Sequence, residues 1–254
     1  MVCITRKYKK IVFDYKLNDV SLEHVSEMKD LGNLLSSDLT WNKNVDNMVA
    51  RANKTMGMIK RACGYQANTF VTKKLYLTLV RCKVEYSSQT WAVQTKRNLT
   101  LIEGVQRRAT CYILGVPRDS LDYKERLTKQ EVLPLSYRRE MLDVKFLFKC
   151  FQNEIDIDLQ NYVTTVQNRT REGFDGVRLQ LPKFKTESYA HSYFIRIVPI
   201  WNQLPLELRD SPNLYVFTQR LKLFYTAQLK ESFNCDNTCT WVSKCRCSKC
   251  RPCF

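Results

Sequence analysis

The stretch NKNVDNMVARANKTMGMIKR, residues 42–61, decides the fold that the sequence predicts. Its apolar side chains recur every three or four residues, the period of an α-helix with one buried face. These apolar positions are Val45, Met48, Val49, Ala52, Met56 and Ile59. The positions between them turn toward solvent and include Arg51, Lys54, Lys60 and Arg61. The stretch therefore predicts an amphipathic helix with a basic exposed side.

Two further helices with basic outer sides are predicted downstream. In the first, about residues 70–84, the side chains expected to point inward are Val71, Leu75, Leu79 and Val80. Its largely outward basic residues are Lys73, Lys74, Arg81 and Lys83. The second covers about residues 99–114, with Arg107 and Arg108 opposite an apolar face that includes Ile102 and Val105. Gly115 and Pro117 end it, so residues 43–115 predict a compact basic helical unit.

The flanking segments complete a mainly α fold with a small β element at the N-terminus. Residues 1–42 contain alternating apolar and polar positions and turn-forming residues, which predict short strands. Residues 116–234 return to helical patterns, so we expect a second helical region there. Within it, residues 163–185 are poor in apolar side chains and predict an exposed loop or a loose β excursion.

Charge is concentrated in one part of this chain. The net charge is +16, and residues 43–115 hold thirteen basic residues against three acidic ones. A concentrated basic block favours a polyanionic partner, and nucleic acid is preferred over a membrane because no amphipathic membrane anchor accompanies it. The chain has no signal-peptide-like start, so we expect a cytoplasmic or nuclear protein. The candidate nucleic-acid contacts are Lys54, Lys60, Arg61, Lys73, Lys74, Arg81, Arg107 and Arg108.

The last twenty residues, 235–254, are rich in cysteine. Disulfides are disfavoured because the expected compartment is reducing and the chain has eleven cysteines, an odd number. Two cysteines separated by two residues can both reach one zinc ion from a tight turn. Six cysteines compete for four ligand places, and the preferred set is Cys235, Cys239, Cys247 and Cys250. The prediction is a zinc knuckle, with a redox-labile tail as the alternative.

Catalytic machinery is hard to find in the sequence. The two histidines lack the spacing of a zinc hydrolase, and no glycine-rich phosphate loop is present. The acidic cluster Glu154, Asp156 and Asp158 is expected to flank a turn rather than to hold a metal ion. Trp41, Trp91 and Trp201 could stack on bases, but core positions are favoured for them.

Four blocks in order resemble the C-terminal part of LINE-type, non-LTR retrotransposon reverse transcriptases. They are KDLGNLLSSDLTW (29–41), LYLTLVRCKVEYSSQTW (75–91), LIEGVQRRATCYILG (101–115) and WNQLPLELRDSPNLYVFTQRL (201–221). The resemblance implies that residues 1–42 are the end of the palm, with Lys29, Leu31 and Gly32 at primer-grip positions. It also implies that residues 43–115 form the thumb, and that residues 116–254 form a C-terminal helical region with a Cys-rich end.

The family's catalytic centre has no counterpart in these residues. Polymerases of this type hold two metal ions with aspartates, and no Asp-Asp pair occurs in the 254 residues. We therefore expect no catalytic magnesium site and no polymerase activity from this chain alone. Three hypotheses follow: a non-catalytic remnant that binds RNA or an RNA–DNA duplex, a polymerase fragment that needs the upstream palm of the same element, or a non-functional relic.

Overall fold

The computed structural model describes residues 2, 4, 13–65, 67–91, 95–170 and 173–231. The predicted mainly α fold with a small β element at the N-terminus is confirmed. The N-terminal strands form two antiparallel pairs, made of β1 (Lys16–Leu17) with β2 (Val20–Ser21) and of β3 (Glu27–Asp30) with β4 (Asn33–Ser36). The candidate zinc ligands Cys235, Cys239, Cys247 and Cys250 lie outside the described residues.

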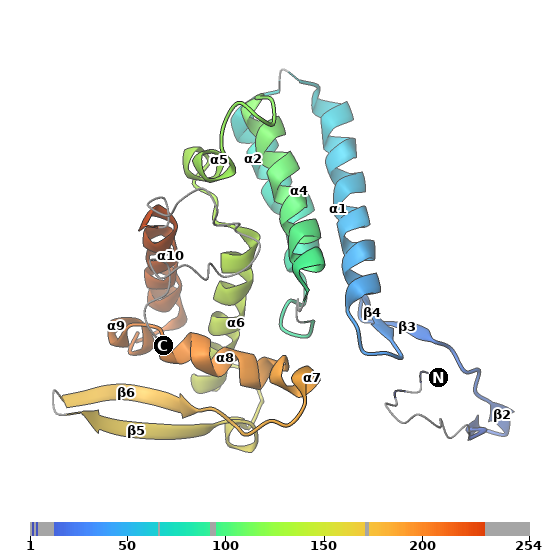
Figure 1. The fold of residues 1–254 in the computed structure, drawn as a ribbon, viewed down its shortest axis with the longest axis vertical. Helices are drawn as coiled ribbons and strands as arrows, with labels where there is room; N and C mark the ends of the chain where they lie inside the picture. Colours follow the sequence, from blue (N-terminus) through green and yellow to red (C-terminus); the bar gives the residue numbers. More distant parts are fainter. Residues whose placement is uncertain are drawn as a thin grey trace.

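The helices of the first helical unit lie side by side (Figure 1) and pack around one apolar core. Its elements are α1 (Asn42–Cys63), α2 (Thr69–Leu75), the π-helical segment η1 (Tyr76–Arg81), α3 (Cys82–Glu85) and α4 (Lys96–Leu114). All six apolar positions predicted for α1 are buried, which confirms its amphipathic pattern. Burying a large apolar side chain stabilises a fold by roughly 1.5–3 kcal/mol, so this face holds α1 in place.

The second helical region surrounds another core. Its elements are α5 (Tyr123–Lys129), α6 (Leu135–Phe151), η2 (Leu159–Asn161), α7 (Glu187–Ala190), α8 (Tyr193–Asn202), α9 (Leu206–Arg209) and α10 (Leu214–Glu231). Between η2 and α7 the chain forms an antiparallel hairpin of β5 (Thr164–Thr170) and β6 (Gly173–Gln180). The structure thus gives the β alternative predicted for residues 163–185, and Val163 and Leu179 of this segment belong to the second core.

The inward face predicted for residues 70–84 is partly wrong. Val80 is buried as predicted and Leu75 is half-buried, but Val71 and Leu79 are 48% and 39% exposed, and the other buried positions are Thr72, Tyr76 and Val84. The buried face differs from the predicted one because it includes polar side chains, which an apolar pattern places outside. Their polar atoms are satisfied internally, since Thr72 Oγ1 donates to the Asn68 carbonyl at 3.1 Å and Tyr76 Oη to Gln106 Oε1 at 2.8 Å.

The described part of the chain holds no helix with both the length and the apolar character that crossing a lipid bilayer requires. Trp91 and Trp201 are fully buried, as expected of core positions, and Trp41 is half-buried. The two cores meet where α6 begins, because Leu135 belongs to the first core while the α6 residues Met141, Val144, Leu147 and Phe148 belong to the second.

Candidate nucleic-acid interface

The turn between β3 and β4 has an unusual backbone. Asp30 pairs with Asn33, so Leu31 and Gly32 form a two-residue turn, and their φ angles are +42° and +88°. Positive φ at both positions is the type I′ geometry that suits the twist of a hairpin. Glycine adopts it without strain, but leucine rarely does. Leu31 is also 83% exposed, so no packing of its side chain compensates for this strain.

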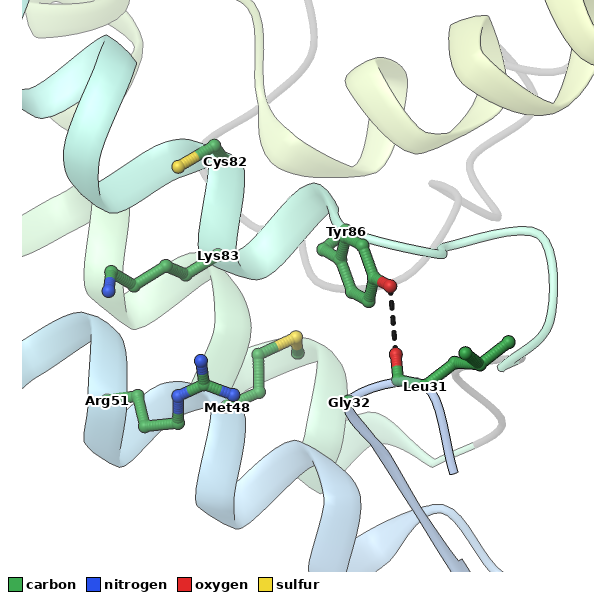
Figure 2. Close-up of a pocket in the computed structure, with 7 residues that line it drawn as sticks. All are labelled: Leu31, Gly32, Met48, Arg51, Cys82, Lys83 and Tyr86. Atoms are coloured by element: carbon green, nitrogen blue, oxygen red, sulfur yellow. Dashed lines mark hydrogen bonds between the residues drawn. The ribbon is translucent and has the colours of Figure 1, made fainter. Parts of the chain in front are cut away.

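Tyr86, which follows α3, holds this turn against the helical unit. Its hydroxyl donates to the Leu31 carbonyl oxygen at 2.8 Å, and Figure 2 shows the ring reaching toward the turn while the Leu31 side chain points away. Buried Trp91 fixes the Tyr86 backbone, because Trp91 Nε1 donates to the Tyr86 carbonyl at 2.9 Å. On the other strand, Leu34 N donates to Asn44 Oδ1 of α1 at 2.9 Å. The turn is therefore anchored to two helices.

A small groove opens between this turn, α1 and α3, as Figure 2 shows. Its volume is about 330 Å³, and its lining residues are Leu31, Gly32, Met48, Arg51, Cys82, Lys83 and Tyr86. Two of them are cationic, one is an aromatic ring, and none is acidic. The groove thus offers positive charge beside apolar surface, an arrangement suited to a phosphate attached to a sugar or a base.

The exposed side of α1 extends the positive charge away from this groove. Arg51, Lys54 and Arg61 are exposed on it, and no acidic residue occurs from Asn47 to Val84. On the side of α1 that faces α4, exposed Arg108 donates from Nη2 to Asn53 Oδ1 at 2.8 Å. We call these four exposed arginine and lysine residues, together with Lys83 of the groove, the basic surface. It consists of Arg51, Lys54, Arg61, Lys83 and Arg108.

Two of the predicted nucleic-acid contacts, Arg81 and Arg107, interact with other side chains of the fold. Arg81 lies in a half-buried ion cluster, where Glu85 Oε1 is 3.4 Å from its Nε and 2.9 Å from Arg138 Nε. Burial lowers the pKa of Arg81, opposed by Glu85. Arg107 is half-buried and stacks over the Tyr123 ring at 4.6 Å. Arg81 and Arg107 therefore stabilise the fold, and we leave them out of the basic surface.

The other predicted lysines occupy three different places. Lys60 and Lys74 lie over aromatic rings at the far end of α1, with Nζ 5.3 Å from the Tyr112 centroid and 5.4 Å from that of Phe70. Lys73 is half-buried on α2, and Lys29 is exposed on β3. The structure thus brings Leu31 and Gly32 together with Arg51 and Lys83, but it places Lys60 and Lys74 at the opposite end of the helix.

The three acidic residues of the unit 43–115 do little to offset this charge. Asp46 pairs with Arg97 at 2.9 Å, and Glu85 pairs with Arg81 and Arg138. Glu103 is 2% exposed, accepts hydrogen bonds from the Tyr123 hydroxyl and from Leu135 N, and has its pKa raised by burial. The unpaired exposed charge of this unit is therefore positive.

Within the described residues no group of three or more His, Cys, Asp or Glu could hold a metal ion. In the acidic cluster, Asp158 accepts from Gln160 N at 3.1 Å and caps η2, as expected for acids that flank a turn. The zinc knuckle over residues 235–254 stays a prediction.

Sequence reasoning missed several groove residues. The helical period directs Lys83 outward without marking it as part of a site, and no sequence pattern marks Tyr86 or Met48 as a groove residue. Tyr86 follows the last helical residue of α3, where periodicity carries no information about its direction. The absence of acids from residue 47 to residue 84 was visible in the sequence and points to the whole basic surface.

Comparisons of the chain with protein-family models, with curated proteins and with solved structures give no match.

Proposed function

We propose that this chain binds the phosphate backbone of an RNA or RNA–DNA duplex through its basic surface and is not an enzyme on its own. The observation that carries the proposal is the one-sided charge of the first helical unit. Its acids are paired or buried, while Arg51, Lys54 and Arg61 lie exposed on one helix. Phosphate contacts of this kind supply affinity without reading sequence.

The resemblance to non-LTR retrotransposon reverse transcriptases supports the same proposal. It relates residues 29–41 to the end of a palm and residues 43–115 to a thumb, which together grip a template–primer duplex in that family. The groove brings Leu31 and Gly32 beside Arg51 and Lys83, so both parts can reach one backbone. On this account the chain is a non-catalytic remnant of such a polymerase.

A second candidate is a polymerase fragment that works only with an upstream palm. One observation favours it: β3 pairs with β4 alone among the described strands, so this sheet can accept a further strand. Adding the upstream part of the same element to this chain would then produce RNA-directed DNA synthesis. Primer extension that is no better with this chain than without it would rule this candidate out.

The test of the first proposal compares two variants with the same loss of charge. In one, the α1 and groove residues Arg51, Lys54, Arg61 and Lys83 become alanine. In the matched control, exposed lysines of the second helical region become alanine, namely Lys183, Lys185, Lys222 and Lys230. We expect the first variant to bind a blunt RNA–DNA hybrid at least about tenfold more weakly at low salt, with little change in the control. Equal losses would show that net charge, and not this surface, carries binding.

A further inference from the structure

Aromatic side chains gather at the end of the first helical unit that lies farthest from the groove. Figure 1 shows α1 ending, α2 beginning and α4 ending at this place. We call it the aromatic tip, defined by Tyr65, Phe70 and Tyr112. Tyr65 is 90% exposed and Phe70 is 67% exposed. Two large rings left in water at one end of a helical unit indicate a surface that a partner covers.

The rings of the aromatic tip are held in defined positions. The Tyr112 hydroxyl donates to the Gly64 carbonyl at 2.7 Å, which fixes the chain just before Tyr65. The Tyr65 ring meets Tyr112 edge to face, with the ring centroids 6.4 Å apart. Because Tyr65 is 90% exposed and is braced by only one other ring among the described residues, a face of its ring is open to a flat ligand.

Positive charge lies beside two of the three rings. Lys60 Nζ lies over Tyr112, and Lys74 Nζ lies over Phe70. Since no acidic residue occurs from Asn47 to Val84, the tip attracts anions and repels cations. Aromatic faces interleaved with cations match an unpaired nucleotide, whose base stacks on a ring while its phosphate meets a lysine.

We propose that the aromatic tip binds unpaired nucleobases, so that the preferred ligand is a duplex continued by a single strand. This inference rests on the proposed function, because it places the single strand next to a duplex held by the basic surface. From Arg51 to the end of α1 at Cys63, a rise of 1.5 Å per residue gives about 18 Å. That length corresponds to about five base-pair steps, which sets the distance between groove and junction.

The experiment measures one ratio by fluorescence anisotropy. The dissociation constant for a blunt RNA–DNA hybrid is divided by that for the same hybrid carrying a single-stranded extension of about six nucleotides. We expect a ratio of about ten or more for the unaltered chain. In the double variant Tyr65→Ala with Phe70→Ala, the ratio falls at least about fivefold, because alanine removes the stacking faces.

Two controls separate stacking from other causes. The ring-preserving double variant Tyr65→Phe with Phe70→Tyr keeps the high ratio, since both faces remain. Tyr215→Ala removes a ring that is 73% exposed on α10, outside the tip, and leaves the ratio unchanged. Because the substituted side chains are exposed, circular dichroism is expected to show the same helix content in all variants.

Each other outcome contradicts the proposal in its own way. If the unaltered chain binds the blunt hybrid but gains nothing from the extension, the tip proposal fails and the proposed function stands. The same holds if the alanine double variant keeps the full ratio. If the only effect of that variant is weaker self-association in sedimentation velocity, the tip covers a second copy of the chain. If neither hybrid binds, the proposed function fails together with this inference.

Discussion

At the scale of single residues, Leu31 is the side chain least suited to its backbone. It takes φ +42° at the first position of a type I′ turn, where asparagine and glycine are preferred. Its side chain is 83% exposed and makes little packing contact. Backbone strain lowers the stability of the fold, so stability does not explain why leucine occupies this position. Strain of this kind beside a groove therefore points to a functional role for the turn.

Replacing Leu31 by asparagine is therefore expected to stabilise the fold. The variant Leu31→Asn relieves the strain and should raise the free energy of unfolding in urea by about 0.5–1 kcal/mol. The neighbouring change Gly32→Ala serves as the opposite control, since Gly32 has φ +88° and an added Cβ would lie 3.5 Å from Tyr86 Cε1. That variant should lose about 1 kcal/mol or more. A stabilised Gly32→Ala would contradict the turn geometry.

Asp143 provides a pH-dependent test at the same scale. Burial raises its pKa to about 6 from an ordinary 3.8, although Arg196, whose Nη2 lies 3.1 Å from Oδ2, opposes the rise. A carboxyl whose pKa is higher in the folded chain than in the unfolded chain makes the fold most stable at pH values below the unfolded pKa. This stability is lost as the pH rises from the unfolded pKa through the folded pKa. Ionisation of Asp143 thus destabilises the fold between about pH 4 and about pH 6.

The variant Asp143→Asn cannot undergo this ionisation. Its free energy of unfolding relative to the unaltered chain should rise by up to about 3 kcal/mol between about pH 4 and about pH 7. Urea unfolding of both proteins at each pH measures the difference in their free energies of unfolding. The contributions of all other titrating groups are the same in both proteins and cancel in this difference. A difference that stays constant or falls over this interval would mean that the Asp143 carboxylate is not desolvated as the structure indicates.

At the scale of the elements, α1 could be predicted from the sequence because all its buried positions except Asn44 are apolar. For the segment that becomes α2, η1 and α3 the sequence predicts the helix, but of its expected inward residues Val80 is buried while Val71 and Leu79 are exposed. Thr72 and Tyr76 take buried positions through internal hydrogen bonds, and these partners lie far away in the sequence or within the backbone itself. No local pattern reveals a partner as distant in the sequence as Gln106 is from Tyr76. The same holds for the contact of Tyr86 with Leu31, so the groove beside Tyr86 could not be predicted.

The ion pairs that join the elements differ in burial, and this difference predicts their contributions. Glu85 accepts two hydrogen bonds from Arg138, at 2.9 and 3.1 Å, and its side chain is 12% exposed. The exposed pair Arg97–Asp46 has side chains 57% and 48% exposed. Removing one partner of a buried pair leaves an uncompensated charge, whereas an exposed pair is screened by water.

We therefore expect Glu85→Ala to lower the free energy of unfolding by about 3 kcal/mol and Asp46→Ala by less than about 1 kcal/mol. Both changes remove one carboxylate from the same helical unit, so each is the control for the other. Urea denaturation at neutral pH provides the two values. Equal losses would contradict the distinction between the half-buried cluster around Glu85 and the exposed pair.

At the scale of the whole molecule, the two helical units are joined by polar contacts as well as by packing. Gln106 Nε2 in α4 donates to the Leu133 carbonyl at 3.0 Å and to the Tyr123 hydroxyl at 3.1 Å. Arg196 in α8 donates to the carbonyls of Ser88 and Gln89 at 3.2 and 3.1 Å, in the segment that follows Tyr86. The second unit thus holds in place the segment that positions the groove.

The charge of the candidate site could be predicted from the sequence, because thirteen basic residues against three acidic ones are visible without a structure. Which of these basic residues lie on the basic surface and which are held within the fold could not be predicted. Arg81 and Arg107 have the same side chain as Arg61, and only contacts with Glu85 and Tyr123, far from Arg61, place the first two inside the fold. Such contacts depend on how the helices pack, which the local periodicity of each helix does not determine.

The central claim is that one surface of the first helical unit binds a phosphate backbone, and its most direct test is the salt dependence of binding. Each phosphate contact adds about −0.7 to −0.9 to the slope of log affinity against log salt concentration. Removing Arg51, Lys54, Arg61 and Lys83 together should flatten the slope for a blunt RNA–DNA hybrid by about 3. The control variant at Lys183, Lys185, Lys222 and Lys230 should keep the original slope. A slope that both variants leave unchanged, or flatten equally, would contradict the account.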